Sequence, residues 1–370
     1  MRKKTTLSLL LIFVLSLCTY VPSAIAEVYA LTINKAIELA LLHSPEVKQA
    51  ENKVDLAYRT EIVKKQEKES AYTRVVGTPF FSEALEADYK MKKKIWQYAQ
   101  DDLSDAQVAL EKTKEKVKYT AENQYLTILN LQNQLAVLQD SLAFQTKLVK
   151  IENIKYKLGL STQLELQQAR ERVEATQNSL QEVKDTLTTL YWSFNRLIGQ
   201  EINIPFRLAP VAFSPVKYNV NKEEGLEQAK EASLALEQFN RLMEDKKEDK
   251  KDLKPGSSDQ CLLLETEMRQ IELNIDALNF GIEAGMKQAW DKVELAQKKL
   301  LEAKNKYGVQ KLNCTYQEQQ YSVGLIPQIA LDTGAMELKQ AEINYEKAVY
   351  DYYLATRELS LAQQGIMLEK

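Results

Sequence analysis

The sequence of 370 residues has one histidine, three cysteines, 11 glycines and 8 prolines. Metal sites and most catalytic sites need clusters of histidine, cysteine and carboxylate side chains, and no such cluster is found at a suitable spacing. A glycine-rich phosphate loop is also missing. His43, at a predicted helix end, is best interpreted as a structural residue. We therefore expect no enzyme, no catalytic residue, no cofactor and no metal site.

Neither sign of charge dominates, because 49 basic and 52 acidic residues leave a net charge of −3. This balance excludes the strongly basic surface that is typical of nucleic-acid binding. After the first 26 residues, no apolar run approaches the ~20 residues of a membrane-spanning helix. The mature chain is therefore expected to have no transmembrane helix.

The first 26 residues have the parts of a secretory signal. Residues 2–4 are basic, residues 9–17 are almost entirely apolar, and residues 24–26 form a small-x-small cleavage site. We expect this segment to be removed from an exported protein. Cys18 follows Leu17, whereas a lipoprotein signal usually has a small residue before its cysteine. Lipid attachment, which would anchor the chain, is therefore the less favoured alternative.

Alanine, leucine, glutamate, lysine and glutamine dominate the remaining sequence, as they do in long helices. Residues 83–156 contain neither proline nor glycine and would form a helix ~110 Å long at ~1.5 Å per residue. Such a helix must pair along its length with other helices. Its apolar residues have the three-and-four spacing of a coiled coil, namely Ile128, Leu131, Leu135, Leu138, Leu142 and Val149.

Two cysteines, Cys261 and Cys314, lie outside the expected signal. Both fall on one predicted helix, where they would be ~80 Å apart at ~1.5 Å per residue. This distance excludes a disulfide between them, and two free thiols are expected.

A short segment occurs twice, 165 positions apart. The copies begin at Tyr156 (YKLGLSTQLEL) and at Tyr321 (YSVGLIPQIAL), and each lies between two long helical patterns. Each copy is therefore expected to be the tip of a helical hairpin. Gly159 and Gly324 suit the left-handed conformation that ends many helices. The pattern predicts an all-α fold of two duplicated, long antiparallel helical hairpins.

The helices after the two tips are expected to begin in different ways. Thr162 and Glu165 have the spacing of a capping box, whereas Pro327 is expected at the first helical position. Apolar residues flank both glycines, and they either form an exposed docking surface or close the core of the hairpin. These residues are Leu158, Leu160, Val323 and Leu325.

The whole chain divides at a segment with three prolines. Residues 27–200 and 223–370 are expected to be two helical-hairpin repeats, joined by an extended linker at 201–222. The starts of the repeats align at an offset of 189 positions. A turn is expected at 71–81 in the first repeat, and the charged run 244–258 is expected to end in the corresponding turn of the second.

These tips resemble those of the TolC family of outer-membrane efflux conduits. An opening Leu-Thr-x-x-x-Ala-Ile at Leu31 and a closing Asn-Arg-Leu-Ile-Gly at Asn195 match the family too. The resemblance covers nearly all of the mature chain. It implies a homotrimer whose helices close into a tunnel, an adaptor (membrane-fusion) protein that docks on the tips, and an inner-membrane pump. It also implies export to the bacterial cell envelope, either to the outer membrane or periplasm or, in an organism without them, to the cell-wall side of the membrane.

The resemblance further implies a gate at the tips. Tyr321 matches a gate tyrosine of the family, and Glu165 matches a gate aspartate with its carboxylate kept. Ile326 stands where an arginine would be, so the ionic part of such a gate is missing. The capping box alone would also explain Glu165. The implied docking residues are Leu158, Gly159, Leu160, Val323, Gly324 and Leu325.

One departure from the family concerns strands. The family has two strands between the paired helices of each half, and these form a barrel in the outer membrane. The segments at 71–81 and 244–258 are too short or too charged for such strands, so little or no β-structure is expected. We therefore expect a shortened efflux-conduit component without its own barrel. The alternative is a non-conducting, structural coiled-coil protein of the cell envelope.

Overall fold

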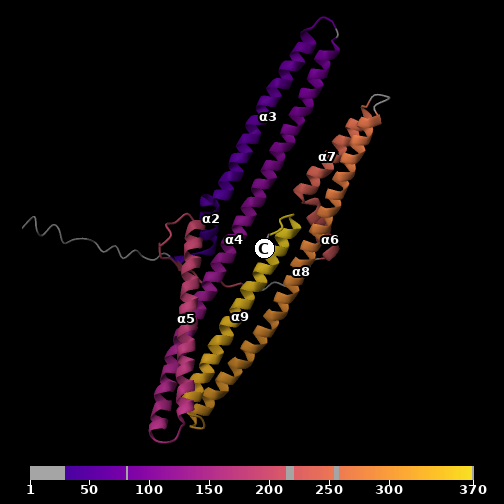
Figure 1. Ribbon diagram of the computed structural model, residues 1–370. Helices are drawn as coiled ribbons and strands as arrows, with labels where there is room; N and C mark the ends of the chain where they lie inside the picture. The colour runs from indigo at the N-terminus through magenta and orange to yellow at the C-terminus, as the bar shows by residue number, and fades with distance from the viewer. Residues whose placement is uncertain (1–29, 81, 214–220, 254–257, 369–370) are drawn as a thin grey trace, which may run out of the picture.

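The computed structural model describes residues 30–80, 82–213, 221–253 and 258–368. The expected signal segment and Cys18 lie outside these ranges. Helices account for most of the described chain, and the molecule is an elongated assembly of long helical pairs (Figure 1). The predicted all-α class with duplicated antiparallel hairpins is confirmed.

The first repeat is organised around one very long helix. Helix α2 (Ile33–His43) leads into α3 (Pro45–Gly77), which pairs with one half of α4 (Glu83–Lys157). The other half of α4 pairs with α5 (Gln163–Leu197) (Figure 1). The 75 residues of α4 are therefore covered by different partners at its two ends.

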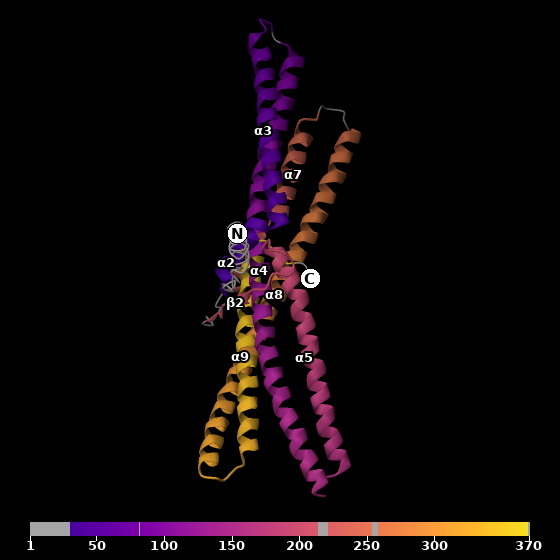
Figure 2. The same ribbon diagram turned by 90° about the vertical axis from the view of Figure 1, so that its left-hand side faces the viewer.

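The second repeat follows the same plan with shorter elements. Helix α6 (Lys222–Glu231) leads into α7 (Leu234–Lys251), which packs on one end of α8 (Ser258–Ser322). The other end of α8 pairs with α9 (Gln328–Gln363). Figure 2 shows the four pairs as stalks that extend in two opposite directions from the middle of the molecule.

The duplication is visible in two serine caps, 189 positions apart. The hydroxyl of Ser44 accepts the backbone N–H of Val47, and the hydroxyl of Ser233 accepts that of Leu236, both at 3.4 Å. Each serine begins the helix that follows a short first helix. Because a serine in this position satisfies a free N–H at the helix start, the same local device recurs at the aligned positions.

The predicted turn of the first repeat was placed too early, whereas the charged run of the second repeat leads to the end of its helix as expected. Helix α3 continues through residues 71–77, and the turn begins only at Thr78, before Pro79. Most of the charged run lies within α7, which ends at Lys251. Opposite charges one helical turn apart stabilise this part of α7, since Glu244 pairs with Lys247 at 2.7 Å.

A two-stranded parallel sheet joins the start of the first repeat to the linker. Strand β1 (Ala30–Leu31) pairs with β2 (Arg207–Leu208), with Leu31 opposite Leu208. Neither strand was predicted from the sequence, because each is only two residues long. They are the only strands in the described ranges, and neither the described part of 71–81 nor that of 244–258 contains one.

The middle of the molecule is the most buried region. Tyr125 of α4 is fully buried, and its hydroxyl donates to the carbonyls of Leu31 and Ala209 at 2.8 and 2.7 Å. One side chain therefore ties α4 to the segments that carry both strands. Its ring also contacts Phe194 of α5 edge-on, at 6.4 Å between centroids.

An ion-pair network joins the two repeats at this level. Arg357 of α9 donates to Glu122 at 3.1 Å and to Glu115 at 3.5 Å, both on α4. Glu122 is buried, with 6% of its surface exposed. A buried carboxylate that loses its cation is costly, so this contact fixes how α9 lies on α4.

Cys261 and Cys314 both lie on α8 and are free thiols, as the sequence predicted.

Within the described ranges, no helix combines the length and the apolar character that a membrane span requires.

The close of the first repeat gives a test of packing. Gly199 has a left-handed φ of 73°, and a methyl group there would lie 2.2–2.6 Å from atoms of His43. We expect Gly199→Ala to lower the free energy of unfolding by about 1–3 kcal/mol, through backbone strain and this collision. Urea denaturation followed by circular dichroism measures the effect.

Gly77→Ala is the matched control, because Gly77 lies within a helix and has no atom within 4 Å of the added methyl position. It should leave stability unchanged or raise it slightly. Equal stability of the two variants would contradict the packing described here.

Candidate docking site at the hairpin tips

The two repeated segments form turns at the same end of the molecule. The first joins α4 to α5 and the second joins α8 to α9 (Figures 1 and 2). The end of α3 and the end of α7 lie toward the opposite end. The duplicated motif therefore marks one pole of the protein.

Both tips close with the same hydrogen-bonded turn. Gly159 and Gly324 have φ values of 68° and 76°, as predicted for left-handed closing glycines. Leu160 N–H donates to the Lys155 carbonyl at 2.9 Å, and Leu325 N–H donates to that of Gln320 at 2.8 Å. This is the Schellman arrangement, in which the residue after the glycine bonds back across the last helical turn.

The helix after the first tip begins with the predicted capping box. Thr162 Oγ1 accepts the N–H of Glu165 at 3.2 Å, and Glu165 Oε2 accepts the N–H of Thr162 at 2.7 Å. Pro327 was predicted to be the first residue of α9, but the helix begins one residue later, at Gln328. Pro327 is the cap itself, because its ψ of 157° is extended rather than helical.

Glu165 is held within its own turn. Besides the backbone bond, it accepts the hydroxyls of Thr162 at 2.9 Å and Ser161 at 3.0 Å. These bonds favour the charged form and lower the pKa of Glu165, with the Thr162 N–H as the largest cause. The Ser161 hydroxyl also donates to Glu152 and lowers the pKa of that carboxyl.

The two gate candidates do not bond to each other within the single chain. Tyr321, on the last turn of α8, has 40% of its surface exposed. Its phenol has no hydrogen-bond partner in the described part of the chain, and Glu165 bonds only within its own turn. The structure thus brings together the capping residues but not the gate pair.

The four apolar residues beside the glycines are exposed. The exposed fractions are 67% for Leu158, 75% for Leu160, 70% for Val323 and 73% for Leu325. Of the two alternatives left open by the sequence, closure of the hairpin core does not apply in the single chain. Exposed leucine and valine side chains on hydrogen-bonded turns form an apolar rim at each tip.

A ladder of polar contacts between α4 and α9 sets the positions of the two tips relative to each other along the helix axes. It runs between α4 and the antiparallel α9, and each step advances seven residues on both helices. The steps toward the tips are Asn133–Glu346 at 2.9 Å, Asp140–Lys339, and Lys147–Asp332 at 4.0 Å. This ladder was not predicted from the sequence, although the polar residues at 133, 140 and 147 have the same seven-residue period as the apolar seam.

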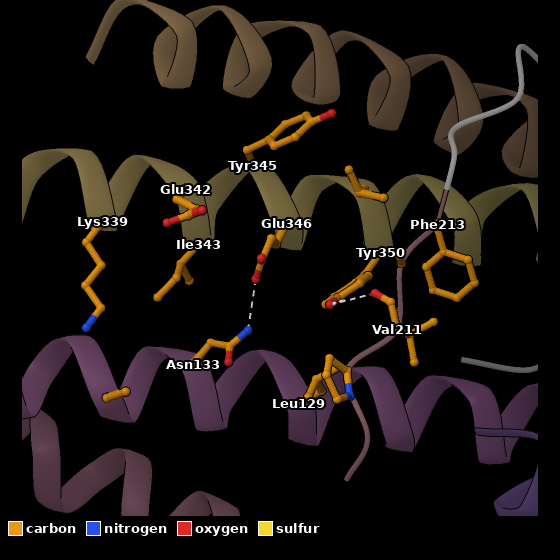
Figure 3. Close-up of a pocket in the computed structure, with 14 residues that line it drawn as sticks. Leu129, Asn133, Val211, Phe213, Lys339, Glu342, Ile343, Tyr345, Glu346 and Tyr350 are labelled. Carbon is orange, nitrogen blue, oxygen red and sulfur yellow. Dashed lines mark hydrogen bonds between the residues drawn. The ribbon is translucent and has the colours of Figure 1, made fainter. Parts of the chain in front are cut away.

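A groove of about 600 Å³ lies where the linker crosses this ladder (Figure 3). Residues 210–213 form one wall, and α4 and α9 form the others. Phe213 stacks on Tyr353 at 4.1 Å between ring centroids and contacts Tyr350 edge-on. Glu346 points toward Asn133 in Figure 3, and its burial, together with nearby Glu342, raises its pKa.

The groove shows no catalytic arrangement. Among the described residues there is no group of three or more histidine, cysteine, aspartate or glutamate side chains that could hold a metal ion. Apolar and aromatic contacts dominate the packing of the linker. We therefore interpret this region as the joint that fixes the linker against α4 and α9.

Comparison with known proteins identifies the architecture. The sequence matches no family model and no curated protein. The structure, however, superposes on the Campylobacter jejuni CmeC outer membrane channel with a TM-score of 0.64 and 12% identity, covering 90% of this chain and 86% of that one. The fold is that of the TolC family.

Further structures agree with this TolC-like fold. The outer-membrane channel OprN gives a TM-score of 0.61 at 12% identity, with 90% of each chain covered. The outer membrane protein VceC from Vibrio cholerae gives 0.56 at 13% identity, covering 90% of this chain and 96% of that one. CmeC and OprN are channels rather than enzymes, in agreement with the expectation of a non-enzyme.

The capping box predicts how pH affects the first tip. Because the pKa of Glu165 is lowered on folding, its stabilisation is present above the unfolded-state pKa. It is lost as the pH falls through the lowered folded-state pKa. Thr162→Ala removes one hydroxyl bond and the cap, so it should raise the pKa of Glu165 and weaken the start of α5 by about 1 kcal/mol.

Carboxyl-carbon NMR titration measures this pKa. Thr176→Ala is the control, since the Thr176 hydroxyl only bonds the Arg172 carbonyl further along α5. An unchanged pKa of Glu165 in Thr162→Ala would argue against the described network.

Proposed function

We propose that this protein is a component of a TolC-like export conduit in the bacterial cell envelope. In this proposal the exported chain forms a homotrimer whose long helices close into a tunnel. A membrane-fusion adaptor docks on the tips and couples the tunnel to an inner-membrane pump. The observation that carries the proposal is the pair of rigid, apolar tips at one pole of a TolC-like fold.

Trimer formation is supported by an uncovered apolar stripe on α8. Its members recur at helical spacing and lead toward the second tip. Their exposed fractions are 59% for Leu301, 56% for Val309, 73% for Leu312 and 61% for Tyr316. Side chains in such a row bury their surface when another helix packs on them, and neighbouring copies of the chain would supply that helix.

Docking is supported by the rigidity of the tips. Leu160 and Leu325 follow left-handed glycines whose turns are closed by backbone bonds. Binding therefore orders little additional chain, which lowers its entropic cost. The docking residues we propose are Leu158, Gly159, Leu160, Val323, Gly324 and Leu325.

The proposed gate at the tips differs from one held by ion pairs. Tyr321 is free to contact a neighbouring protomer, whereas Glu165 is engaged in its capping box. Ile326 supplies no charge at the position where the family resemblance implies an arginine. We therefore propose that Tyr321 and apolar contacts, rather than a salt bridge, narrow the entrance.

The mass of the purified protein in solution tests the tunnel. We expect a trimer by light scattering. Leu312→Lys should reduce its association, because the stripe would have to bury a charge. Leu42→Lys is the control, since Leu42 is exposed to a similar extent, 63%, on α2. A monomeric wild-type protein would favour the structural coiled-coil alternative.

Replacement of the tip residues tests docking. Leu160→Ser together with Leu325→Ser should abolish co-purification of the adaptor from the producing cells, while helicity stays unchanged. Bulky residues at Gly159 and Gly324 should have the same effect, because their φ values strain any side chain. Undiminished co-purification in these variants would contradict docking at the tips.

A further inference from the structure

The pole opposite the docking tips carries the most exposed large apolar side chain of the described residues. Phe80, in the α3–α4 turn, has 82% of its surface exposed, and Val76 has 65%. The sequence from Val75 to Ser82 contains no charged residue. In both Figures 1 and 2 this turn is at the far end of its stalk, beyond the end of the α7–α8 pair.

Tyrosines lie directly behind this apolar end. Tyr72 of α3 and Tyr89 of α4 contact each other, with ring centroids 5.5 Å apart. Tyr72 is one helical turn, or ~6 Å, from Val76 at ~1.5 Å per residue. An aromatic ring with a hydroxyl is suited to the boundary between an apolar phase and water.

Two acidic side chains near this end are neutralised, whereas the exposed Glu69 of α3 has no ion pair within the described residues. Asp88 pairs with Arg74 at 2.8 Å, and Glu86 pairs with Lys90 at 3.1 Å. Glu83 has no ion pair within the described residues, but it lies in the first turn of α4, where the helix dipole favours a negative charge. The paired groups therefore offer little opposition to an anionic surface, and only Glu69 and Glu83 remain without a cation among the described residues near this end.

Basic side chains follow further along the stalk. Lys92 and Lys93 lie about ten residues beyond Ser82, or ~15 Å at ~1.5 Å per residue. Neither has an ion pair within the described ranges. On α3, the ammonium of Lys68 lies over the Trp96 ring, 3.6 Å from its centroid. Polarity thus changes along the stalk from apolar residues to tyrosines and then to lysines.

We propose that the α3–α4 turn is a lipid-binding tip that inserts into the surface of a bilayer. Val76 and Phe80 enter the outer part of the acyl region, and Tyr72 and Tyr89 lie at the headgroups. Lys92 and Lys93 face anionic phosphates. Two apolar side chains on a convex turn are too few for a stable protein interface, which buries ~800 Å² per partner. Insertion into lipid needs no complementary surface.

This inference goes beyond the proposed function and does not depend on it, because all the residues belong to one stalk of one chain. A monomer that forms no tunnel would still bind lipid through this tip. Conversely, a trimer that binds its adaptor could lack the lipid contact. The two proposals therefore fail in different experiments.

Site-specific fluorescence tests insertion. Phe80→Trp is compared with Leu325→Trp, which places tryptophan on the opposite pole at a residue that is 73% exposed. The probe is vesicles of phosphatidylethanolamine and phosphatidylglycerol, with and without brominated acyl chains. After subtraction of the wild-type signal, the emission of Trp at position 80 should shift to shorter wavelength and be quenched by bromine. The emission at position 325 should not change.

Vesicle partitioning of apolar-to-polar variants gives a second measurement. Phe80→Ser should lower the partition coefficient by about tenfold to a hundredfold, the contribution expected of one inserted phenylalanine. Leu325→Ser should leave it unchanged. Neither exposed side chain supports the fold, so both variants should keep wild-type helicity. Equal responses at the two poles, or none at either, would overturn the proposal.

Discussion

The need to cover α4 along its whole length determines most of this structure. A helix of 75 residues is far longer than any compact core, and most helical stability in proteins comes from the packing of one face against a partner. Helix α4 meets this need with different partners at different levels. It contacts α3 at one end and α5 at the other, while α2 and α9 pack beside it. The tips, the linker and the joint between repeats all take their positions from it.

The middle of α4 is where these contacts converge. The Tyr125 hydroxyl donates to carbonyls in or next to both strands of the small sheet. The Glu122 carboxylate accepts a hydrogen bond from Arg357 of the second repeat. These contacts are buried, so their loss would leave polar groups without partners. The two poles, in contrast, are built from exposed turns. The protein therefore combines a firmly packed middle with ends that are available to other molecules.

The sequence was sufficient for features that depend on local chemistry. The closing glycines, the Thr162–Glu165 capping box and the proline-free run of α4 are all determined by residues close together in the chain. Features that depend on distant partners were missed. Strands β1 and β2 are too short to have a recognisable period, and they are positioned by Tyr125 from another element. The end of α3 was placed too early because a nearby Gly77 and Pro79 suggested a turn, whereas Gly77 itself is still helical.

The order of charges in the α4–α9 ladder has a consequence for folding fidelity. Long helices with a seven-residue pattern can pair in several registers, each displaced by one repeat. Displacement in one direction would place Asp140 opposite Asp332. Displacement in the other would place Asp140 opposite Glu346 and Lys147 opposite Lys339. Either error brings like charges together, so only one alignment of the two repeats satisfies the whole row. A chain that misaligns during folding would therefore be driven back toward the correct pairing.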